Sequence, residues 1–288
     1  MRYHRPHRLE DALTIRASED VMPLAGGTDV YPAKVTRAGW GDRRHKDVLD
    51  LSLLRDLRGI SESADGWRIG ALTTWSDIAN AHLPAAFDGL KAAARDVGGV
   101  QIQNRGTIAG NICTASPAGD GAPSLLALDA SVEITSRRGA RTVPLRDFMT
   151  GYRTTACKPD ELVTAILVPP QPERAQGAFL KLGARRYLVI SIAMVGGIVA
   201  TDAAGCITHA RFGLGACSAT PQRLDTLEAA LIGTPVATAA ERVAPAHLAH
   251  LSPIDDVRAS AAYRREAALQ LTRDILQSIA VQKPRRAA

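Results

Sequence analysis

The sequence predicts an α+β protein built from two domains, and three observations support that class. Its 288 residues suffice for two domains, and 46% of them are hydrophobic, which is enough for ordinary globular cores. Three prolines fall within the polar stretch Pro169–Gln176, which is the expected boundary. Beyond it, three apolar or alternating segments come first and helical patterns follow, which is typical of an antiparallel sheet with a helix cluster. The expected domains are residues 1–172 and 177–288.

Helices and strands are interleaved in the first domain. Thr74 begins a Thr-Trp-Ser-Asp capping box, which predicts a helix through Ala81. Thr28 is expected to cap a helix over Val30, Ala33 and Lys34. Turns at Asp65-Gly66 and Arg138-Gly139 predict two hairpins. The other expected elements are helices at Leu9–Ala17 and Leu90–Val97 and strands at Val21–Ala25, Val48–Leu51, Leu57–Ser61, Trp67–Ala71, Val132–Thr135, Arg141–Val143 and Leu162–Val168.

The second domain is expected to hold a three-stranded antiparallel sheet followed by helices. Gly205 marks the turn between the last two strands, and Thr220-Pro221 gives a capping hydroxyl with proline in a first turn, which predicts a helix start. The expected strands are Ala178–Gly183, Ile192–Thr201 and Cys206–Gly215, and the expected helices are Arg223–Ile232, Val236–Ala246 and Ala261–Ala280. Apolar residues at three- and four-residue spacing form one stripe on the last helix.

Composition argues against several classes of protein. The net charge is +6, but acidic residues are interleaved with basic ones and aromatics are only 4%, so a solvated face or a face toward an acidic partner is expected rather than nucleic acid. No apolar run approaches ~20 residues, and the polar N-terminus lacks a signal-peptide core, so no membrane contact is expected and the cytoplasm is the expected location. Cysteines at 113, 157, 206 and 217 form no C-x-x-C pair, so no metal site is expected.

Two glycine-rich loops carry the strongest functional signal. The segment Asn104–Asp129 combines four glycines with hydroxyl side chains and Asp120, and Ala25-Gly26-Gly27-Thr28-Asp29 lies about eighty residues upstream. Small residues let a ligand reach backbone N–H groups, which form anion-binding concavities. Hydroxyls and a carboxylate add hydrogen bonds to sugar hydroxyls. Two such loops together predict a ligand with two phosphates and a sugar.

These segments resemble the FAD-binding subunits of the molybdenum hydroxylases, the xanthine dehydrogenase and carbon monoxide dehydrogenase (medium subunit) family. The pair A-G-G-T-D and G-T-I-A-G-N…A-S-P…D matches, and so does Phe179-Leu180-Lys181-Leu182 with Arg185-Arg186, which is similar to an F-x-K-x-x-x-R strand. Ser252–Ser260 with Tyr263-Arg264-Arg265 is similar to the C-terminal signature S-P-x-x-D-x-R-x-S-x-x-Y-R-R. The resemblance implies a two-part FAD-binding domain of the vanillyl-alcohol-oxidase-like type, followed by a smaller C-terminal flavoprotein domain.

The resemblance also implies FAD as the cofactor of this chain and a set of residues around it. The first loop would wrap the pyrophosphate, the second would continue along the ribityl chain, and Asp120 would accept a hydrogen bond from a ribityl or ring donor. Lys181 would approach the flavin, where a cation raises the potential. The implied cofactor-binding residues are Leu24, Ala25, Gly26, Gly27, Thr28, Asp29, Val30, Val97, Gly106, Thr107, Ile108, Ala109, Gly110, Asn111, Cys113, Thr114, Gly119, Asp120, Val163 and Lys181.

Each of these assignments has a plainer alternative. The first loop could be an ordinary strand-to-helix turn, Asp120 a helix cap, Lys181 a solvated strand lysine, and the two valines simple core residues. Two departures from the family pattern also matter. Ala109 replaces a glycine, which costs on the order of 1 kcal/mol if the position requires a left-handed backbone. Gln103 replaces an arginine, and Arg105 follows nearby.

The expected function is electron transfer, because no nucleophile–base constellation or zinc motif stands out among seven scattered histidines. The resemblance implies an oxidoreductase subunit that takes electrons from [2Fe-2S] clusters on a small partner subunit, which receives them from a molybdenum cofactor on a large one. A dimer of heterotrimers is the implied assembly. The alternatives are a self-contained FAD-dependent oxidase or reductase and a flavin-free scaffold subunit. The sequence identifies neither the substrate nor the electron acceptor.

Overall fold

The computed structural model describes residues 2–32 and 46–281. The N-terminal part is a small parallel sheet in the order β1-β3-β2, with β1 at Tyr3–His4, β2 at Val21–Leu24 and β3 at Asp47–Asp50. Helix α1, Leu9–Ser18, connects β1 to β2. Ala12 and Leu13 of α1 are buried in a core that includes Val21 and Leu49, so this sheet has its own apolar support.

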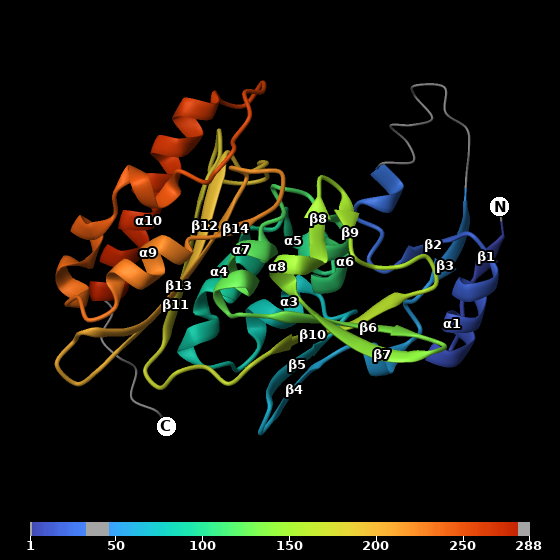
Figure 1. Ribbon diagram of the computed structural model, residues 1–288. Helices are drawn as coiled ribbons and strands as arrows, with labels where there is room; N and C mark the ends of the chain where they lie inside the picture. The colour runs from blue at the N-terminus through green and yellow to red at the C-terminus, as the bar shows by residue number, and fades with distance from the viewer. Residues whose placement is uncertain (1, 33–45, 282–288) are drawn as a thin grey trace.

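The middle part is a five-stranded antiparallel sheet with short helices beside it. Its order is β4-β5-β10-β6-β7, formed by Ile60–Ser63, Gly66–Gly70, Leu162–Val168, Ser131–Ser136 and Gly139–Pro144. Strand β6 buries alternate residues, as a strand with one face on a core must. Between β5 and β6 come α3 (Trp75–Asn80), α4 (Asp88–Asp96), α5 (Val100–Gln103), α6 (Ile108–Thr114) and α7 (Gly121–Ala127). Figure 1 shows these elements at the centre of the molecule.

After β7, a short helix and a small hairpin lead back to the central strand β10. These are α8 (Leu145–Phe148), β8 (Met149–Gly151) and β9 (Thr154–Thr155). Buried Phe148 and Leu145 anchor the start of this connection in the main core. The 3-10 segments η1 (Arg55–Leu57) and η2 (Ala85–Phe87) complete the middle part.

The C-terminal part is a four-stranded antiparallel sheet between two helical layers. Its order is β11-β12-β13-β14, formed by Gln176–Leu182, Ala193–Thr201, Ile207–Gly215 and Gln222–Arg223. The long helix α10, Ala261–Val281, packs on β12, while α7 of the middle part contacts β12 and β13. A Cβ at Gly213 would lie 2.2 Å from the carbonyl oxygen of Pro123, so the close contact between α7 and this sheet requires glycine. Figure 1 shows this sheet between the central helices and α10.

The structure corrects several expectations for the second domain. The expected three-stranded sheet has a fourth short strand, β14, and Thr220-Pro221 leads into that strand rather than into a helix. Helix α9 begins later, at Asp225, and ends at Leu231. The expected helix Val236–Ala246 is instead two 3-10 segments, η3 (Val236–Arg242) and η4 (Pro245–Leu248). A proline disfavours helical backbone angles in the residue before it. Ala244, which precedes Pro245, accordingly has an extended backbone that separates the two segments.

The first domain agrees more closely with expectation. The Thr74 capping box is present, with the Thr74 side chain accepting from Asp77 N–H and the Asp77 carboxylate accepting from Thr74 N–H. The expected strand Leu57–Ser61 begins only at Ile60, because Leu57 is the last residue of η1 and Arg58 is its C-cap. For the helix expected after Thr28, Val30–Pro32 are helical, and Ala33 and Lys34 lie outside the described residues. Within the described residues, no helix is both long and apolar enough to cross a membrane.

Candidate functional site

A cavity of about 970 Å³ lies between the N-terminal parallel sheet and the helices of the middle part. All but three of the implied cofactor-binding residues line it. Those that do are Ala25, Gly26, Gly27, Thr28, Asp29, Val30, Val97, Gly106, Thr107, Ala109, Gly110, Asn111, Cys113, Thr114, Gly119, Asp120 and Val163. Of the other three, Leu24 is a buried residue that lines a neighbouring cavity, Ile108 is fully buried in the core, and Lys181 reaches Asp120 through its ammonium.

The two glycine loops touch each other at one wall of this cavity. A Cβ at Gly26 would lie 1.9 Å from the carbonyl oxygen of Arg105, so only glycine allows this approach. Gly27 adopts φ +76°, which also favours glycine. The side chain of Thr107 accepts a hydrogen bond from Gly110 N–H at 3.1 Å and caps α6. Segments about eighty residues apart therefore form one continuous backbone surface.

The two departures from the family pattern have simple structural outcomes. Ala109 lies in the first turn of α6, outside the left-handed region, and is 4% exposed. The strain considered for alanine there does not arise. The Gln103 amide donates to the carbonyl oxygen of Arg95 at 2.7 Å, which ties α5 to the end of α4. Arg105 is exposed and forms no ion pair with any residue in 2–32 or 46–281.

Asp120 is the centre of a buried polar cluster at the cavity wall. Lys181 Nζ lies 2.6 Å from Asp120 Oδ2, and Ser191 Oγ donates to Asp120 Oδ1 at 2.6 Å. Asp120 is 8% exposed, Ser191 is fully buried, and the Lys181 side chain is 9% exposed. Burial raises the pKa of Asp120, and its interactions with Lys181 and Ser191 oppose that rise.

This geometry excludes two of the plainer alternatives. Asp120 is the residue before α7, but its side chain makes no capping hydrogen bond. Lys181 is not a solvated strand lysine, because it is enclosed with the carboxylate and also donates to the carbonyl oxygen of Asp96 at 3.4 Å. A carboxylate and a cation are thus held together where the resemblance places the flavin.

The C-terminal signature, Ser252–Ser260 with Tyr263-Arg264-Arg265, holds the segment next to this cluster. Arg264 is 1% exposed and donates to the carbonyl oxygen of Ile192 at 2.6 Å, directly beside Ser191. It also pairs with Asp256 at 2.7 Å. Hydrogen bonds from Arg258 and Arg264 lower the pKa of the Asp256 carboxyl. The signature residues therefore hold the segment before β12 that carries Ser191.

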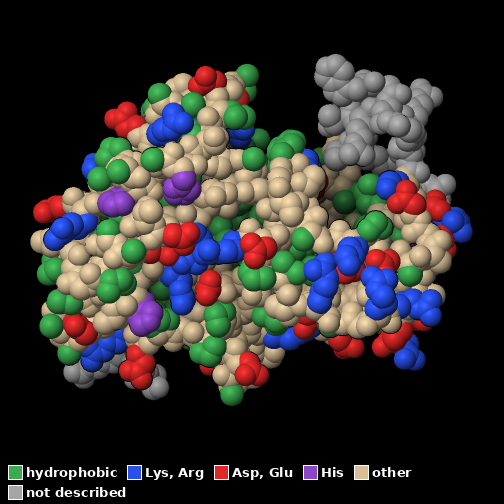
Figure 2. All heavy atoms as spheres, viewed as in Figure 1, with side chains coloured by type: hydrophobic (Ala, Val, Ile, Leu, Met, Phe, Trp, Pro, Cys, Tyr) green, Lys and Arg blue, Asp and Glu red, His purple; other side chains and the backbone are tan. Residues whose placement is uncertain are grey.

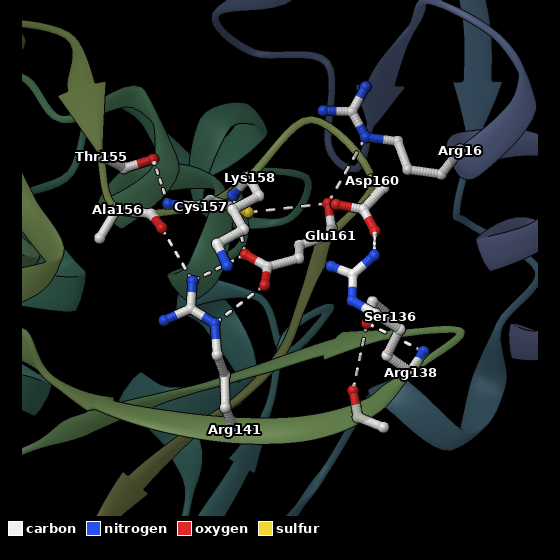
Figure 3. Close-up of polar contacts among 11 residues, drawn as sticks. Arg16, Ser136, Arg138, Arg141, Thr155, Ala156, Cys157, Lys158, Asp160 and Glu161 are labelled. Atoms are coloured by element: carbon white, nitrogen blue, oxygen red, sulfur yellow. Dashed lines mark hydrogen bonds and ion pairs between the residues drawn. The ribbon is translucent and has the colours of Figure 1, made fainter.

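The opposite end of the cavity is held by an ion-pair network around Glu161 (Figure 3). Arg141 donates to both Glu161 carboxylate oxygens at 2.9 and 2.7 Å, and Lys158 N–H donates to one of them at 2.7 Å. The Arg141 hydrogen bonds lower the pKa of Glu161, whose side chain is 4% exposed. Arg16 of α1 donates to the carbonyl oxygens of Glu161 and Val21. This network joins the N-terminal sheet to strand β10.

Two cysteines belong to the same end of the cavity. Desolvation inside the cavity raises the pKa of Cys113 to about 12 and that of Cys157 to about 11, although Cys113 is exposed and Cys157 partly exposed on the cavity surface. All four cysteines are free thiols, and only Cys217 is buried as a residue. Cys113 and Cys157 stay protonated near neutral pH and present apolar sulfur to the cavity.

The sequence patterns did not mark several residues that line the cavity. Arg153 lines the cavity and pairs with Asp29 at 3.2 Å, which joins the first glycine loop to the β8–β9 hairpin. Arg153 adopts φ +53°, and no sequence pattern marked it. Leu188, Val189 and Ile190 also line the cavity, and no sequence pattern marked these three residues. The neighbouring Tyr187 is 64% exposed and does not line the cavity.

The cavity fits FAD on features of its own. Its volume falls in the upper part of the ~300–1,000 Å³ range of small-molecule sites, as a dinucleotide requires. It presents backbone from two glycine loops, hydroxyls from Thr28, Thr107 and Thr114, and apolar walls at Val97 and Val163. The buried amide oxygen of Asn111 has no hydrogen-bond partner among the described residues, which suits a site completed by a ligand.

Comparison with known proteins gives the same assignment. Residues 1–171 match the family described as the FAD binding domain in molybdopterin dehydrogenase, and residues 178–279 match the CO dehydrogenase flavoprotein C-terminal domain. A xanthine dehydrogenase FAD-binding subunit of Escherichia coli O157:H7 is 32% identical over 283 residues, covering 95% of this chain and 94% of that protein. The nicotinate dehydrogenase FAD-subunit of Eubacterium barkeri is 34% identical over 280 residues, covering 92% and 91%.

A solved structure agrees along the whole length. A chain of reconstituted CO dehydrogenase from Oligotropha carboxidovorans superposes with a TM-score of 0.91 at 30% identity, covering 98% of both chains. Family match, sequence identity and fold coincide over the same residues that build the cavity. The chain therefore belongs to the FAD-binding, medium-subunit family of the xanthine and carbon monoxide dehydrogenase type, and it is an FAD-dependent oxidoreductase subunit.

Proposed function

We propose that this chain is the electron-transfer subunit of a heteromeric molybdenum hydroxylase. It would take electrons from iron–sulfur clusters of a small partner subunit and pass them to an external acceptor. The observation that carries the proposal is the single cavity in which two glycine loops and the buried Asp120–Lys181 pair come together. A large subunit with the molybdenum cofactor would oxidise the substrate.

The proposed roles of the residues follow from their chemistry. The loops around Gly26 and Gly106 would bind the pyrophosphate through backbone N–H groups, and Thr114 would meet sugar hydroxyls. Asp120 would accept a hydrogen bond from the ribityl chain or ring while Lys181 holds its charge. Lys181 would also raise the flavin potential, since a nearby cation favours a reduced ring that carries negative charge. FAD, when bound, would supply the electron-accepting chemistry.

The finer architecture is part of the same proposal. We assign residues 1–172 to an FAD-binding domain of the vanillyl-alcohol-oxidase-like type and 177–288 to the C-terminal domain. We propose a dimer of heterotrimers as the assembly. The four free cysteines favour a reducing compartment such as the cytoplasm.

The proposal is tested by comparing the chain alone with the assembled complex. Alone, it should not oxidise a purine, an aldehyde or an N-heterocycle, and should at most move electrons between FAD and an artificial or physiological carrier. Co-expression with large and small subunits from neighbouring genes should restore turnover. Substrate-dependent flavin reduction by the chain alone would contradict the relay and favour a self-contained enzyme. A purified chain that never shows flavin absorbance would favour the scaffold alternative.

A further inference from the structure

A second cavity, of about 720 Å³, shares a wall with the proposed flavin site. Gly26 and Thr107 line both cavities, so the contact between the two glycine loops belongs to the wall between them. The second cavity also receives residues from β1, β3, η1 and the turn after α5. Of the implied cofactor-binding residues, Leu24, Ala25, Gly26 and Thr107 line this cavity, and all but Leu24 also line the proposed flavin site.

The lining of this cavity is strongly basic. Arg5, Arg55, Arg58 and Arg105 line it together with one carboxylate, Asp50. Asp50 is already occupied, since Tyr3 Oη donates to it at 2.5 Å and Arg5 lies 3.1 Å away. An excess of positive charge therefore faces the cavity.

Two of the arginines have no partner among residues 2–32 and 46–281. Arg58 pairs with Asp77, at 2.8 Å. Arg55 and Arg105, by contrast, make no side-chain hydrogen bond or ion pair with the part of the chain that the structure describes. A guanidinium group can donate two parallel hydrogen bonds to a carboxylate, so these two side chains are available to a carboxylate from outside the chain.

The exposure of the lining favours a protein over a small ion. The side chains of Arg5 and Arg58 are 52% and 56% exposed, and Tyr3 and Tyr31 are each 54% exposed. A small anion between such groups would stay largely hydrated, so it would gain little binding free energy. A protein surface would cover them, and arginine and tyrosine are the residue types enriched at such contacts.

We propose that this second cavity docks a carboxylate-bearing segment of a partner subunit. The proposal rests on the proposed function and names the surface through which the chain meets a partner of the complex. A partner seated there would lie against the back of the loops that hold the FAD pyrophosphate. Docking and cofactor binding would then share one wall.

The test is a charge reversal of the two unpartnered arginines. The double variant Arg55→Glu/Arg105→Glu is compared with Arg137→Glu/Arg174→Glu, which changes the charge equally at two exposed arginines outside the cavity that also lack a partner within 2–32 and 46–281. Each is co-expressed with the large and small subunits from neighbouring genes. Recovery of partner per flavin chain is measured at about 50 mM and about 500 mM salt, because salt screens exposed charges.

The cavity variant should recover at least tenfold less partner at low salt, while the control variant assembles like the wild type. At high salt, the difference in partner recovery between the wild type and the cavity variant should be smaller. Both variants should keep the wild-type melting temperature, because the exchanged side chains form no hydrogen bond or ion pair with the described residues, and assembly is compared after each protein has been saturated with FAD. Equal assembly of both variants would overturn the proposal, and so would inorganic pyrophosphate binding in this cavity without any effect on assembly. FAD content of the wild type is read separately: assembly without FAD would refute the cofactor proposal and not this one.

Discussion

At the scale of single residues, the Asp120–Lys181–Ser191 cluster is the proposed link between the fold and the flavin. A buried carboxylate and a buried ammonium are each costly alone, and here both are satisfied within 2.6 Å contacts. Such a pair is weak evidence for added stability, because well-packed apolar residues often serve as well. Its position on the cavity wall instead indicates a role toward the ligand.

This role predicts distinct outcomes for two variants. Asp120→Ala should weaken FAD binding by ~1–3 kcal/mol, about 5- to 150-fold in Kd, and should lower the melting temperature because Lys181 is left buried without its partner. The double variant Asp120→Ala/Lys181→Met should recover most of the melting temperature but not the FAD affinity. Titration of apo-protein with FAD, alongside thermal unfolding, checks both. Full recovery of FAD affinity in the double variant would reduce the cluster to a structural role.

Glu161 provides a pH-dependent prediction at the same scale. Its folded-state pKa is lowered by Arg141, so its stabilisation is fully present above the unfolded value of ~4.3 and is lost as pH falls through the folded value. Glu161→Gln should lower the free energy of unfolding by ~2 kcal/mol at pH 7, and the difference from wild type should shrink below about pH 4. Denaturant titrations across this pH range measure it.

The neighbouring carboxylate is a matched control. Asp160 pairs with Arg138, whose side chain is 66% exposed, so this pair is mostly solvated. Asp160→Asn should lower the free energy of unfolding by less than Glu161→Gln does, because exposed ion pairs contribute little. An equal or larger loss in Asp160→Asn would contradict the importance given to the buried network.

At the scale of elements, the contact between the two glycine loops is the critical junction. Gly26→Ala would place a methyl group against the Arg105 carbonyl, so the loops must separate, and FAD binding should fall at least tenfold together with stability. Gly139→Ala is the control. Alanine is disfavoured at the backbone angle φ +117° of this position, but its methyl group would meet only open space in the β6–β7 turn. It should lose ~1 kcal/mol of stability and keep full FAD affinity. Normal FAD affinity in Gly26→Ala would contradict the shared wall.

Elements with strong local signals were predictable, and those set by distant contacts were not. The Thr74 capping box and the hairpin at Gly139 are local, and both are confirmed. Strand β14 is two residues long and is formed by pairing with β13, which no local pattern reports. The helices α6 and α7 lie within the glycine segment and were not predicted, because glycines and small residues weaken helical periodicity.

The residues of the site likewise divide into those with a local signal in the sequence and those placed by distant contacts. Glycines and Asp120 were marked by their residue types, and most of them line one cavity. Arg153 and Glu161 were not, because each acquires its place through partners far along the chain, Asp29 and Arg141. Ser191 is a further example, since only the fold brings it to Asp120.

At the scale of the whole molecule, the cavity lies at a junction between independently supported parts. The N-terminal sheet and the middle part each have an apolar cluster, and the C-terminal sheet has a third. Arg223 of β14, which also pairs with Glu228 of α9, joins the C-terminal part to the middle part through its ion pair with Asp129. On the face shown in Figure 2, positive and negative side chains are interspersed. Each large part contributes one wall or support to the same site.

The central claim, that this junction binds FAD, is tested most directly by mass analysis of the cofactor released from the purified chain. Two glycine loops that meet along one cavity call for a diphosphate, so the account predicts FAD at about one equivalent per chain after reconstitution. Recovery of FMN, or of no flavin at all from the folded protein, would contradict it.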